Sequence, residues 1–327
     1  MTGADAHRTA GDQTTPGLEL SVVIPAFNDV DNLDPLLRSL EAVLVPLRIP
    51  YEIIIVDDGS SDGTWKALTA ATRHDPRIVG LGLSRNFGHQ GALLAGLSRA
   101  RGRAVISMDA DLQHPPDVIP RLLDAWHQGA QVVRTIRRDA GIASPFKRFS
   151  SRNFYRVFAF LTGIPMAGGM SDFRLLDRRV LDELLQLKNR DLFLRGSVEW
   201  LGYRTVTLEF DVAARHAGVS KYTLGRMTRF AVGAVISFSS KPLKIGIWIG
   251  LCTSLLALGE IGYAFVQYLR GETVPGWASL TAVMSFLFGV LFLVLGVIGA
   301  YIGRIHDILQ NRPPFVIAET TEGADGG

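Results

Sequence analysis

Cysteine is nearly absent from this chain of 327 residues, and so is a strong excess of either charge. The single cysteine, Cys252, excludes an intrachain disulfide and is typical of a reducing compartment. The formal net charge of +3 is too small to indicate a nucleic-acid-binding protein. Internal repeats of solenoid length are also missing, and low-complexity sequence is confined to the termini. The composition is therefore that of one globular domain of ordinary size with an appendage.

Two further signals are missing: metal-ligand spacing among the seven histidines, and a secretory leader. Isolated histidines such as His89 and His114 are more often structural than ligating, and we interpret them as structural. Residues 1–17 are short, polar and without an apolar core, which predicts a disordered leader and no signal peptide.

Two long apolar runs are present near the C-terminus, and they raise the mean hydropathy to +0.21. Residues 245–268 and 280–302 are each long enough to cross a bilayer, which takes roughly 20 helical residues. Glu260 is the only charged residue within them. A buried core hairpin is the alternative, but it would need a very large soluble core. We therefore predict a transmembrane hairpin over residues 243–303, followed by a C-terminal tail over residues 304–327.

Positive residues are more frequent outside the two runs than in the turn between them, which has one positive residue, Arg270, and one negative residue, Glu272. Those outside are Lys241, Lys244, Arg304 and Arg312. This asymmetry predicts that both termini and the globular domain lie in the cytoplasm. Glu260 within a span is consistent with an ion path or with pairing between helices or protomers, and it favours a homo-oligomer.

The segment before the first apolar run, residues 221–242, has apolar residues at helical spacing beside Lys221, Arg226 and Arg229. This pattern predicts an amphipathic helix on an anionic membrane surface. A helix that faces a protein core has the same period and is the alternative. The position directly before a membrane span favours the membrane surface.

Four apolar runs alternate with helical patterns in the first half of the chain: residues 18–26, 51–56, 78–83 and 104–108. Runs that are apolar at nearly every position are typical of strands buried on both faces. The alternation predicts a mostly parallel sheet wrapped by helices, with ligands bound at the carboxyl ends of the strands. A cluster of polar residues follows each run, so all four clusters are expected at that edge.

The cluster after the fourth run contains two carboxylates one residue apart, Asp109 and Asp111, and Pro115 and Pro116 end the regular structure there. Carboxylates in this arrangement can converge on one hard cation. Mg²⁺ or Mn²⁺ bound by one or two carboxylates keeps open positions for the phosphates of a substrate. Ordinary turns have the same pattern, so the assignment depends on the neighbouring motifs.

Those motifs resemble a known family. Val-Val-Ile-Pro-Ala-Phe-Asn-Asp, Val-Asp-Asp-Gly-Ser-Ser-Asp-Gly-Thr, Ser-Arg-Asn-Phe-Gly and Met-Asp-Ala-Asp-Leu-Gln-His-Pro-Pro, in this order, resemble the inverting family 2 glycosyltransferases, which have an α/β, Rossmann-like GT-A fold. Residues 146–148, 171–175, 193–196 and 215–222 are similar to the polyprenyl-phosphate glycosyltransferase branch, which includes dolichyl-phosphate mannose synthase. The resemblance implies a GT-A domain over residues 18–220. The subgroup with a two-helix anchor is typified by bactoprenol glucosyltransferases, which implies a bacterial inner (plasma) membrane.

The resemblance also implies a nucleotide pocket at the ends of the first two strands. Pro25, Ala26 and Asn28 would line this pocket through main-chain contacts. Asp57 would contact the base, and Asp58 would face the nucleoside and the metal. Asp57 also has an alternative role as a turn or helix-cap residue.

The implied metal ligands are Asp111 and Gln113, with Asp109 contacting the metal, the ribose or both. The ion would be Mg²⁺ or Mn²⁺. His114 stands where the family often has an acidic residue, so a metal role is not expected for that position.

The acceptor of this branch is a lipid phosphate, and cationic residues are needed to hold it beside the donor. The candidates for binding the acceptor phosphate are Arg148, Arg195, Arg215, Ser220 and Lys221. Contact of these residues with lipid headgroups is the alternative. Asp172 matches the acidic residue near the acceptor, and we expect it to orient the sugar or the nucleophile or to act as a base. A structural salt bridge between Asp172 and Arg174 or another arginine is the alternative.

The resulting hypothesis is a membrane enzyme that transfers one sugar from a nucleotide-sugar donor to polyprenyl phosphate, with inversion and with Asp172, Arg215 and Lys221 as catalytic residues. UDP-glucose is the expected donor, while GDP-mannose and a UDP-N-acetylhexosamine remain alternatives. A processive polysaccharide synthase is disfavoured because the chain has no Gln-x-x-Arg-Trp motif. A non-catalytic nucleotide-binding adaptor or flippase scaffold is the alternative of a different class.

Overall fold

The computed structural model describes residues 17–137, 170–187, 194–211, 239, 241–271, 276–310 and 312–321. These residues fall into two compact units. A globular unit contains the described residues up to 211 together with those from 313 onward, and a helical unit contains those from 239 to 312. Residues 212–238 and 240 lie outside the described residues, so the amphipathic helix expected over 221–242 stays a prediction.

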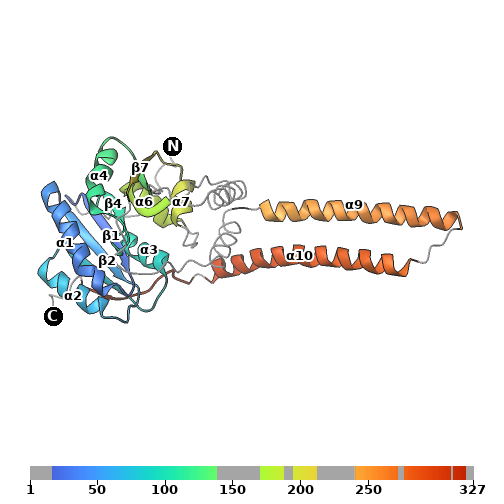
Figure 1. Ribbon diagram of the computed structural model, residues 1–327, viewed down its shortest axis with the longest axis horizontal. Helices are drawn as coiled ribbons and strands as arrows, with labels where there is room; N and C mark the ends of the chain where they lie inside the picture. Colours follow the sequence, from blue (N-terminus) through green and yellow to red (C-terminus); the bar gives the residue numbers. More distant parts are fainter. Residues whose placement is uncertain are drawn as a thin grey trace, which may run out of the picture. The chain divides into compact units, whose positions relative to one another are not determined.

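The globular unit is built on a mixed sheet of eight strands in the order β7-β5-β6-β4-β1-β2-β3-β8 (Figure 1). The strands are β1 Leu20–Ala26, β2 Tyr51–Asp57, β3 Ile78–Leu83, β4 Ala104–Ser107, β5 Val132–Arg137, β6 Met170–Asp177, β7 Thr205–Phe210 and β8 Ile317–Thr320. The four central strands β4, β1, β2 and β3 are parallel to one another. Strand β6 runs antiparallel to β4 and β5, and β8 runs antiparallel to β3.

Helices cover both faces of this sheet, and the alternation of side chains along each strand divides the core in two. The helices are α1 Val30–Leu47, α2 Thr64–His74, α3 His89–Arg99, α4 Ile119–His127, α6 Arg178–Gln186 and α7 Leu194–Trp200. On β1, Val22 and Ile24 pack in the cluster that contains α1 and α4, whereas Val23 packs in the cluster that contains α3, α6 and α7. Every residue of β1 to β4 is buried, as expected for strands covered on both sides.

The predicted fold class and the first four strands are confirmed. Strand β3 has the same bounds as the apolar run at residues 78–83, and the other three strands start or end within a few residues of their runs. The helices between them follow the predicted order.

Strand β8 was not predicted. The sequence analysis described residues 304–327 only as a tail, but residues 317–320 pair with β3, with Leu81 opposite Thr320. The indole Nε1 of Trp65 donates a hydrogen bond of 2.7 Å to Glu319 Oε2. A strand of four residues, three of them exposed, has too few apolar positions to show a period of two.

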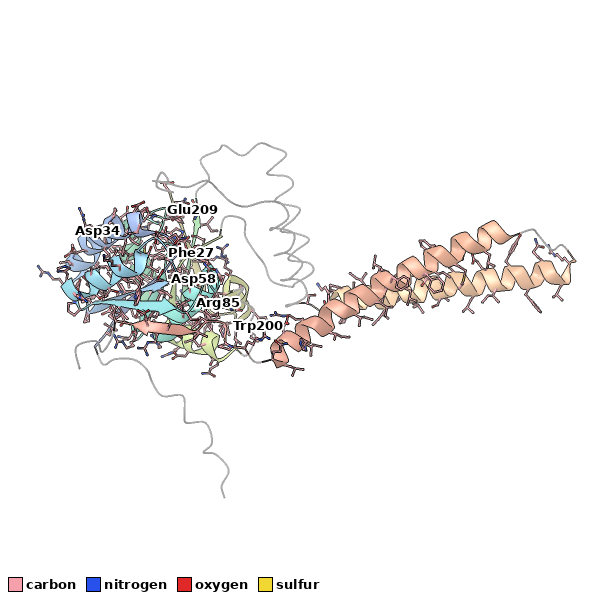
Figure 2. The ribbon with its side chains drawn as sticks, turned by 90° about the horizontal axis from the view of Figure 1, so that it is seen from below. Phe27, Asp34, Asp58, Arg85, Trp200 and Glu209 are labelled. Atoms are coloured by element: carbon pink, nitrogen blue, oxygen red, sulfur yellow. The ribbon has the colours of Figure 1, made fainter. Side chains whose placement is uncertain are left out.

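The helical unit consists of α9 Lys241–Leu269 and α10 Trp277–Leu309. Both predicted apolar runs therefore form helices. The candidate spans Lys241–Gln267 and Phe286–Leu309 have mean hydropathies of 1.7 and 2.5, and neither is buried within the protein. Their side chains project outward along both helices (Figure 2). Glu260 is exposed on α9. By length and composition, the two helices can cross a membrane.

Candidate active site

The loops after β1 and β2 meet at the carboxyl edge of the sheet and are hydrogen-bonded to each other. Asn28, in the left-handed region at φ 54°, donates its main-chain N–H to Ser60 Oγ at 2.9 Å. The side-chain Oδ1 of Asn28 accepts a hydrogen bond from the Ser61 N–H at 2.9 Å. The Asn28 side chain therefore holds the β2 loop in place. The main-chain N–H of Asn28 is also in use, so the expected main-chain contact of Asn28 with a nucleotide stays a prediction.

Asp62 has a structural role in the same loop. Its carboxylate accepts hydrogen bonds from the N–H groups of Val30 and Thr64 and from Thr64 Oγ1. It therefore fixes the starts of α1 and α2.

Asp57 and Asp58 end β2, and both are buried. Asp58 accepts hydrogen bonds from the N–H groups of Phe87 and Gly88, at 2.7 and 2.9 Å. Burial raises the pKa of Asp58 although these two hydrogen bonds act against it. Asp57 accepts a hydrogen bond from the Ser60 N–H at 3.2 Å, and burial raises its pKa as well. The structure thus places Asp58 as the anchor of the loop that follows β3.

Close packing between the loop after β2 and the loop after β3 explains why residue 59 is glycine. A Cβ on Gly59, which has φ +70°, would lie 2.7 Å from the carbonyl carbon of Arg85. Only glycine allows this approach and this backbone conformation without strain. Figure 2 labels one residue of each loop, Asp58 and Arg85.

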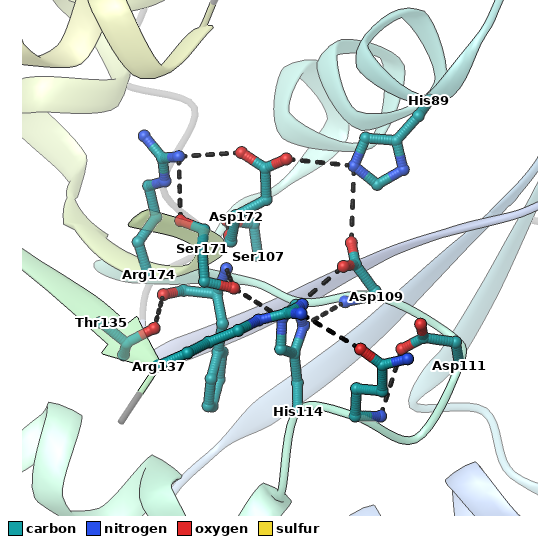
Figure 3. Close-up of polar contacts among 12 residues, drawn as sticks. His89, Ser107, Asp109, Asp111, His114, Thr135, Arg137, Ser171, Asp172 and Arg174 are labelled. Carbon is teal, nitrogen blue, oxygen red and sulfur yellow. Dashed lines mark hydrogen bonds and ion pairs between the residues drawn. The ribbon is translucent and has the colours of Figure 1, made fainter. Parts of the chain in front are cut away.

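Asp109 lies just beyond β4 and is oriented by a buried histidine (Figure 3). The main-chain N–H of Asp109 donates to His114 Nδ1 at 2.9 Å, and His114 Nε2 lies 2.6 Å from Ser171 Oγ. Burial, with a further contribution from Arg137, lowers the pKa of His114 to about 4. The imidazole is therefore neutral at pH 7. Because Nδ1 accepts a hydrogen bond, the ring proton is on Nε2, which donates to Ser171. His114 is structural, as predicted.

The Oδ1 atom of Asp109 is buried and has no hydrogen-bond partner. The nearest cationic group is His89 Nε2, at 3.4 Å. Burial raises the pKa of Asp109, because a charged carboxylate is costly away from water. A buried acceptor in this state is suited to a cation or to a hydrogen-bond donor of a ligand.

Asp111 and Gln113 continue the same loop. The Gln113 N–H donates to Asp111 Oδ1 at 3.1 Å, and Gln113 Oε1 accepts a hydrogen bond from Arg137 Nη1 at 3.2 Å. Together with Asp109 they provide carboxylate and amide oxygens, the ligands that Mg²⁺ and Mn²⁺ prefer. Among the described residues, no three His, Cys, Asp or Glu side chains are grouped as a complete metal site. The donor set therefore fits an ion that is shared with a substrate.

Asp172 on β6 is buried and contacts four side chains from three elements. Figure 3 shows two of these side chains, Arg174 and His89, on either side of the carboxylate. Arg195 of α7 donates to Oδ1 from Nε at 2.8 Å and to Oδ2 from Nη2 at 2.6 Å. Arg174 Nη2 donates to Oδ1 at 2.8 Å. Gln90 Nε2 donates to Oδ2 at 3.1 Å, and His89 Nε2 lies 3.4 Å from the same oxygen. The salt bridge to Arg174, which the sequence left as an alternative, is present, and one to Arg195 accompanies it.

These contacts determine the charge of Asp172. Burial alone would raise its pKa, but the hydrogen bonds from Arg195 and His89 outweigh burial and hold the pKa well below the usual value. The carboxylate is therefore ionised at every pH at which the protein is expected to work.

The structure brings one part of the predicted site together and does not describe another part. His89 Nε2 lies 3.4 Å from a carboxylate oxygen of Asp109 and from one of Asp172, and Asp172 is paired with Arg195. Arg148, Arg215, Ser220 and Lys221 lie outside the described residues, so their roles stay predictions. Pro25, Ala26, Asn28, Asp57 and Asp58 lie at the ends of β1 and β2, as expected.

The sequence analysis missed His89 and Gln90. It interpreted His89 as a structural residue, yet this side chain lies between two acidic groups of the site. Both residues directly follow the Ser-Arg-Asn-Phe-Gly motif at the start of α3. Their place after a motif at the carboxyl edge is the signal that could have found them.

A mostly parallel sheet with acidic groups at its carboxyl edge, followed by two apolar helices, defines a glycosyltransferase of the GT-A type with a helical hairpin. Residues 21–185 match the model of glycosyl transferase family 2, and residues 241–305 match that of the GtrB C-terminal hairpin. The chain belongs to glycosyl transferase family 2.

The chain is similar to relatives over nearly its whole length. An uncharacterized glycosyltransferase of Synechocystis sp. is 40% identical over 92% of this chain and 95% of its own. The SfII prophage-derived bactoprenol glucosyl transferase of Shigella flexneri is 34% identical over 94% and 99%. Among solved structures, glucosyl-3-phosphoglycerate synthase from Mycobacterium tuberculosis aligns with a TM-score of 0.45 and 19% identity, over 72% of this chain and 85% of that one.

Proposed function

We propose that the protein transfers one glucose from UDP-glucose to polyprenyl phosphate, with inversion, at the cytoplasmic face of a bacterial inner membrane. The observation that carries the proposal is the buried, unpartnered Oδ1 of Asp109 at the carboxyl edge of a family 2 domain that continues into an apolar hairpin. Relatives named bactoprenol glucosyl transferase support the choice of sugar and acceptor.

The donor would bind across the ends of β1, β2 and β4. Main-chain groups of Pro25, Ala26 and Asn28 would line the nucleotide pocket, with Asp57 at the base. Asp109, Asp111 and Gln113 would hold Mg²⁺ or Mn²⁺. When bound, the divalent ion would neutralise the negative charge that develops on the departing diphosphate.

The acceptor would be a phosphate that is already ionised, since its second pKa is near 6. It therefore needs cationic groups that hold it near the anomeric carbon against repulsion from the donor diphosphate. We assign this role to Arg195, and two observations support the assignment: its guanidinium is held by Asp172, and its side chain is 35% exposed. We assign the same work to Arg148, Arg215, Ser220 and Lys221 by resemblance.

The hairpin of α9 and α10 would anchor the enzyme in the bilayer where its lipid acceptor resides. Lys241 and Lys244 at the start of α9 and Arg312 after α10 favour a cytoplasmic position for both ends of the hairpin. The homo-oligomer suggested by Glu260 also stays a proposal.

The test is a transfer assay on the purified full chain in detergent with Mn²⁺ and undecaprenyl phosphate. Radiolabelled UDP-glucose, GDP-mannose and UDP-N-acetylglucosamine are supplied in separate reactions. We expect a single lipid-linked product from UDP-glucose. A product only from another donor would correct the sugar, and no product from any donor would favour an adaptor or a flippase scaffold.

A further inference from the structure

We propose that Asp172 is a positioning residue: its carboxylate holds Arg195 and His89 in the site and removes no proton from the acceptor. The inference rests on the proposed function, since it requires the acceptor to be a phosphate. It gives Asp172 a role that differs from that of a general base.

The lone pairs of Asp172 are already in use. A carboxylate has about four acceptor positions. Oδ1 accepts from Arg195 Nε and Arg174 Nη2, both at 2.8 Å. Oδ2 accepts from Arg195 Nη2 and Gln90 Nε2, with His89 Nε2 at 3.4 Å. A general base needs an oxygen within hydrogen-bond reach of the proton that it removes, and these donors occupy that space.

The backbone at Asp172 is fixed as well. Ser107 Oγ on β4 donates a hydrogen bond to the main-chain oxygen of Asp172, and β4 pairs with β6. A carboxylate that is 4% exposed on a fixed strand is a rigid support for longer side chains. Through it, β6 is connected to α3 by His89 and Gln90 and to α7 by Arg195.

The two residues held by Asp172 face different parts of the reaction. His89 Nε2 is also 3.4 Å from Asp109 Oδ1, in the region assigned to the donor diphosphate. Arg195 is 35% exposed and can present its guanidinium to an anionic acceptor. Asp172 therefore sets the distance between the groups that would bind the two substrates.

The transfer itself needs no proton acceptor. An anionic phosphate oxygen of the lipid supplies the electron pair for its new bond to the anomeric carbon. The bond between that carbon and the donor diphosphate breaks, and its electron pair leaves with the nucleoside diphosphate. No hydrogen is gained or lost by either substrate, so a base at Asp172 would have nothing to remove.

The test is the pH dependence of kcat/KM for undecaprenyl phosphate, measured with wild type, Asp172→Asn and Arg195→Gln. We expect each variant to lower kcat/KM by about a hundredfold. The pH near 6 below which kcat/KM falls should stay the same, because this fall reports protonation of the lipid phosphate. The double variant should lose little more than either single variant, since the two residues act as a unit. A base at Asp172 predicts two other results. Asp172→Asn would lose far more activity than Arg195→Gln at every pH, and wild type would show a solvent deuterium isotope effect on kcat/KM, because a proton would move in the transfer step.

Binding of UDP with Mn²⁺, measured by calorimetry, verifies that each variant is folded. Asp182→Asn is the matched control, because Asp182 pairs with Arg178 at 3.4 Å outside the site and should leave every parameter unchanged. If Asp172→Asn does not fold, the solvent isotope effect of wild type still decides between the two roles. Absence of any lipid product from wild type would overturn the proposed function, whereas a solvent isotope effect on an active wild type would overturn only this inference.

Discussion

The two ends of the central sheet both have buried carboxylate oxygens, but they differ in how completely those oxygens are hydrogen-bonded. At the amino end, Glu52 Oε1 accepts from Ser21 Oγ and from the Arg101 N–H, at 2.6 and 2.8 Å. Its Oε2 accepts from Nε and Nη2 of the Arg101 side chain. At the carboxyl end, Asp109 Oδ1 has no hydrogen-bond partner, and burial raises the pKa of this residue.

This difference indicates which buried carboxylate stabilises the fold and which one is available to a ligand. The Glu52 cluster is complete and connects the starts of β1 and β2 to the segment before β4, so it stabilises the sheet. In the Asp109 cluster, Oδ1 accepts no hydrogen bond and has only His89 Nε2 at 3.4 Å, so this costly buried acceptor is suited to a ligand. Residue types alone do not distinguish the two clusters. Their position along parallel strands and their hydrogen bonds do.

The largest expected effect is on activity at the carboxyl end. We predict that Asp109→Asn or Asp111→Asn lowers transfer by about a thousandfold, since the charge that holds the divalent ion is lost. The melting temperature without ligand should change little for Asp109→Asn, because the loss of the 3.4 Å contact with His89 is offset by removal of a costly buried charge. The transfer assay and thermal melting measure the two quantities. Near wild-type activity in both variants would remove the metal assignment.

A smaller effect concerns pH and His114, next to Asp109. Its folded-state pKa of about 4 lies below the ordinary histidine pKa of 6.5, so between these two pH values the unfolded chain binds more protons. The stabilisation is fully present above pH 6.5 and is lost as pH falls toward 4, by about 3 kcal/mol in total.

Thermal melting of the full chain in detergent at pH 7 and pH 5 tests this prediction. Wild type should lose more stability on acidification than His114→Gln, which does not titrate. Asp109 acts with the opposite sign, because its raised pKa favours the folded state at low pH, but it is present in both proteins. Equal losses in the two proteins would contradict the assignment of a neutral, buried His114.

At the amino end the expected effect is on stability. Glu52→Ala leaves Ser21 Oγ and the Arg101 N–H without their acceptor and should cost about 2 kcal/mol, because Arg101 keeps partial access to water. Thermal melting should show a lower transition, while kcat of the folded enzyme stays within about threefold of wild type. Loss of activity with an unchanged melting temperature would give the amino end a catalytic role.

The smallest effect is expected at the exposed edge formed by β8. Glu319→Gln weakens the hydrogen bond from Trp65 Nε1, which is exposed, and should cost less than about 1 kcal/mol. A shift of the melting temperature by more than a few degrees would show that β8 contributes more to the domain than this single contact.

The sequence predicted the carboxyl edge well because strands and their following loops are local patterns. The apolar runs at residues 18–26, 51–56 and 104–108 predicted β1, β2 and β4, and their parallel order then placed Asp109 and Asp58 at one edge. The Asp172 contacts were not predictable in the same way. His89, Asp172 and Arg195 lie on three separate elements, and no local period encodes which side chains of a folded sheet will touch.

Two further features could not be predicted from local sequence patterns. The hydrogen bonds from Phe87 and Gly88 to Asp58 depend on the backbone path of a loop, which glycine and short polar residues permit but do not specify. Strand β8 follows a helix of the hairpin and is recognisable only once β3 offers an unpaired edge.

Binding of Mn²⁺ to the full chain in the presence of UDP, followed by electron paramagnetic resonance, tests the central claim most directly. We predict that wild type and Glu52→Gln bind one ion each and that Asp109→Asn binds none at the same concentration. Equal binding in Asp109→Asn, or loss of binding in Glu52→Gln alone, would contradict the assignment of the carboxyl-end cluster as the functional site.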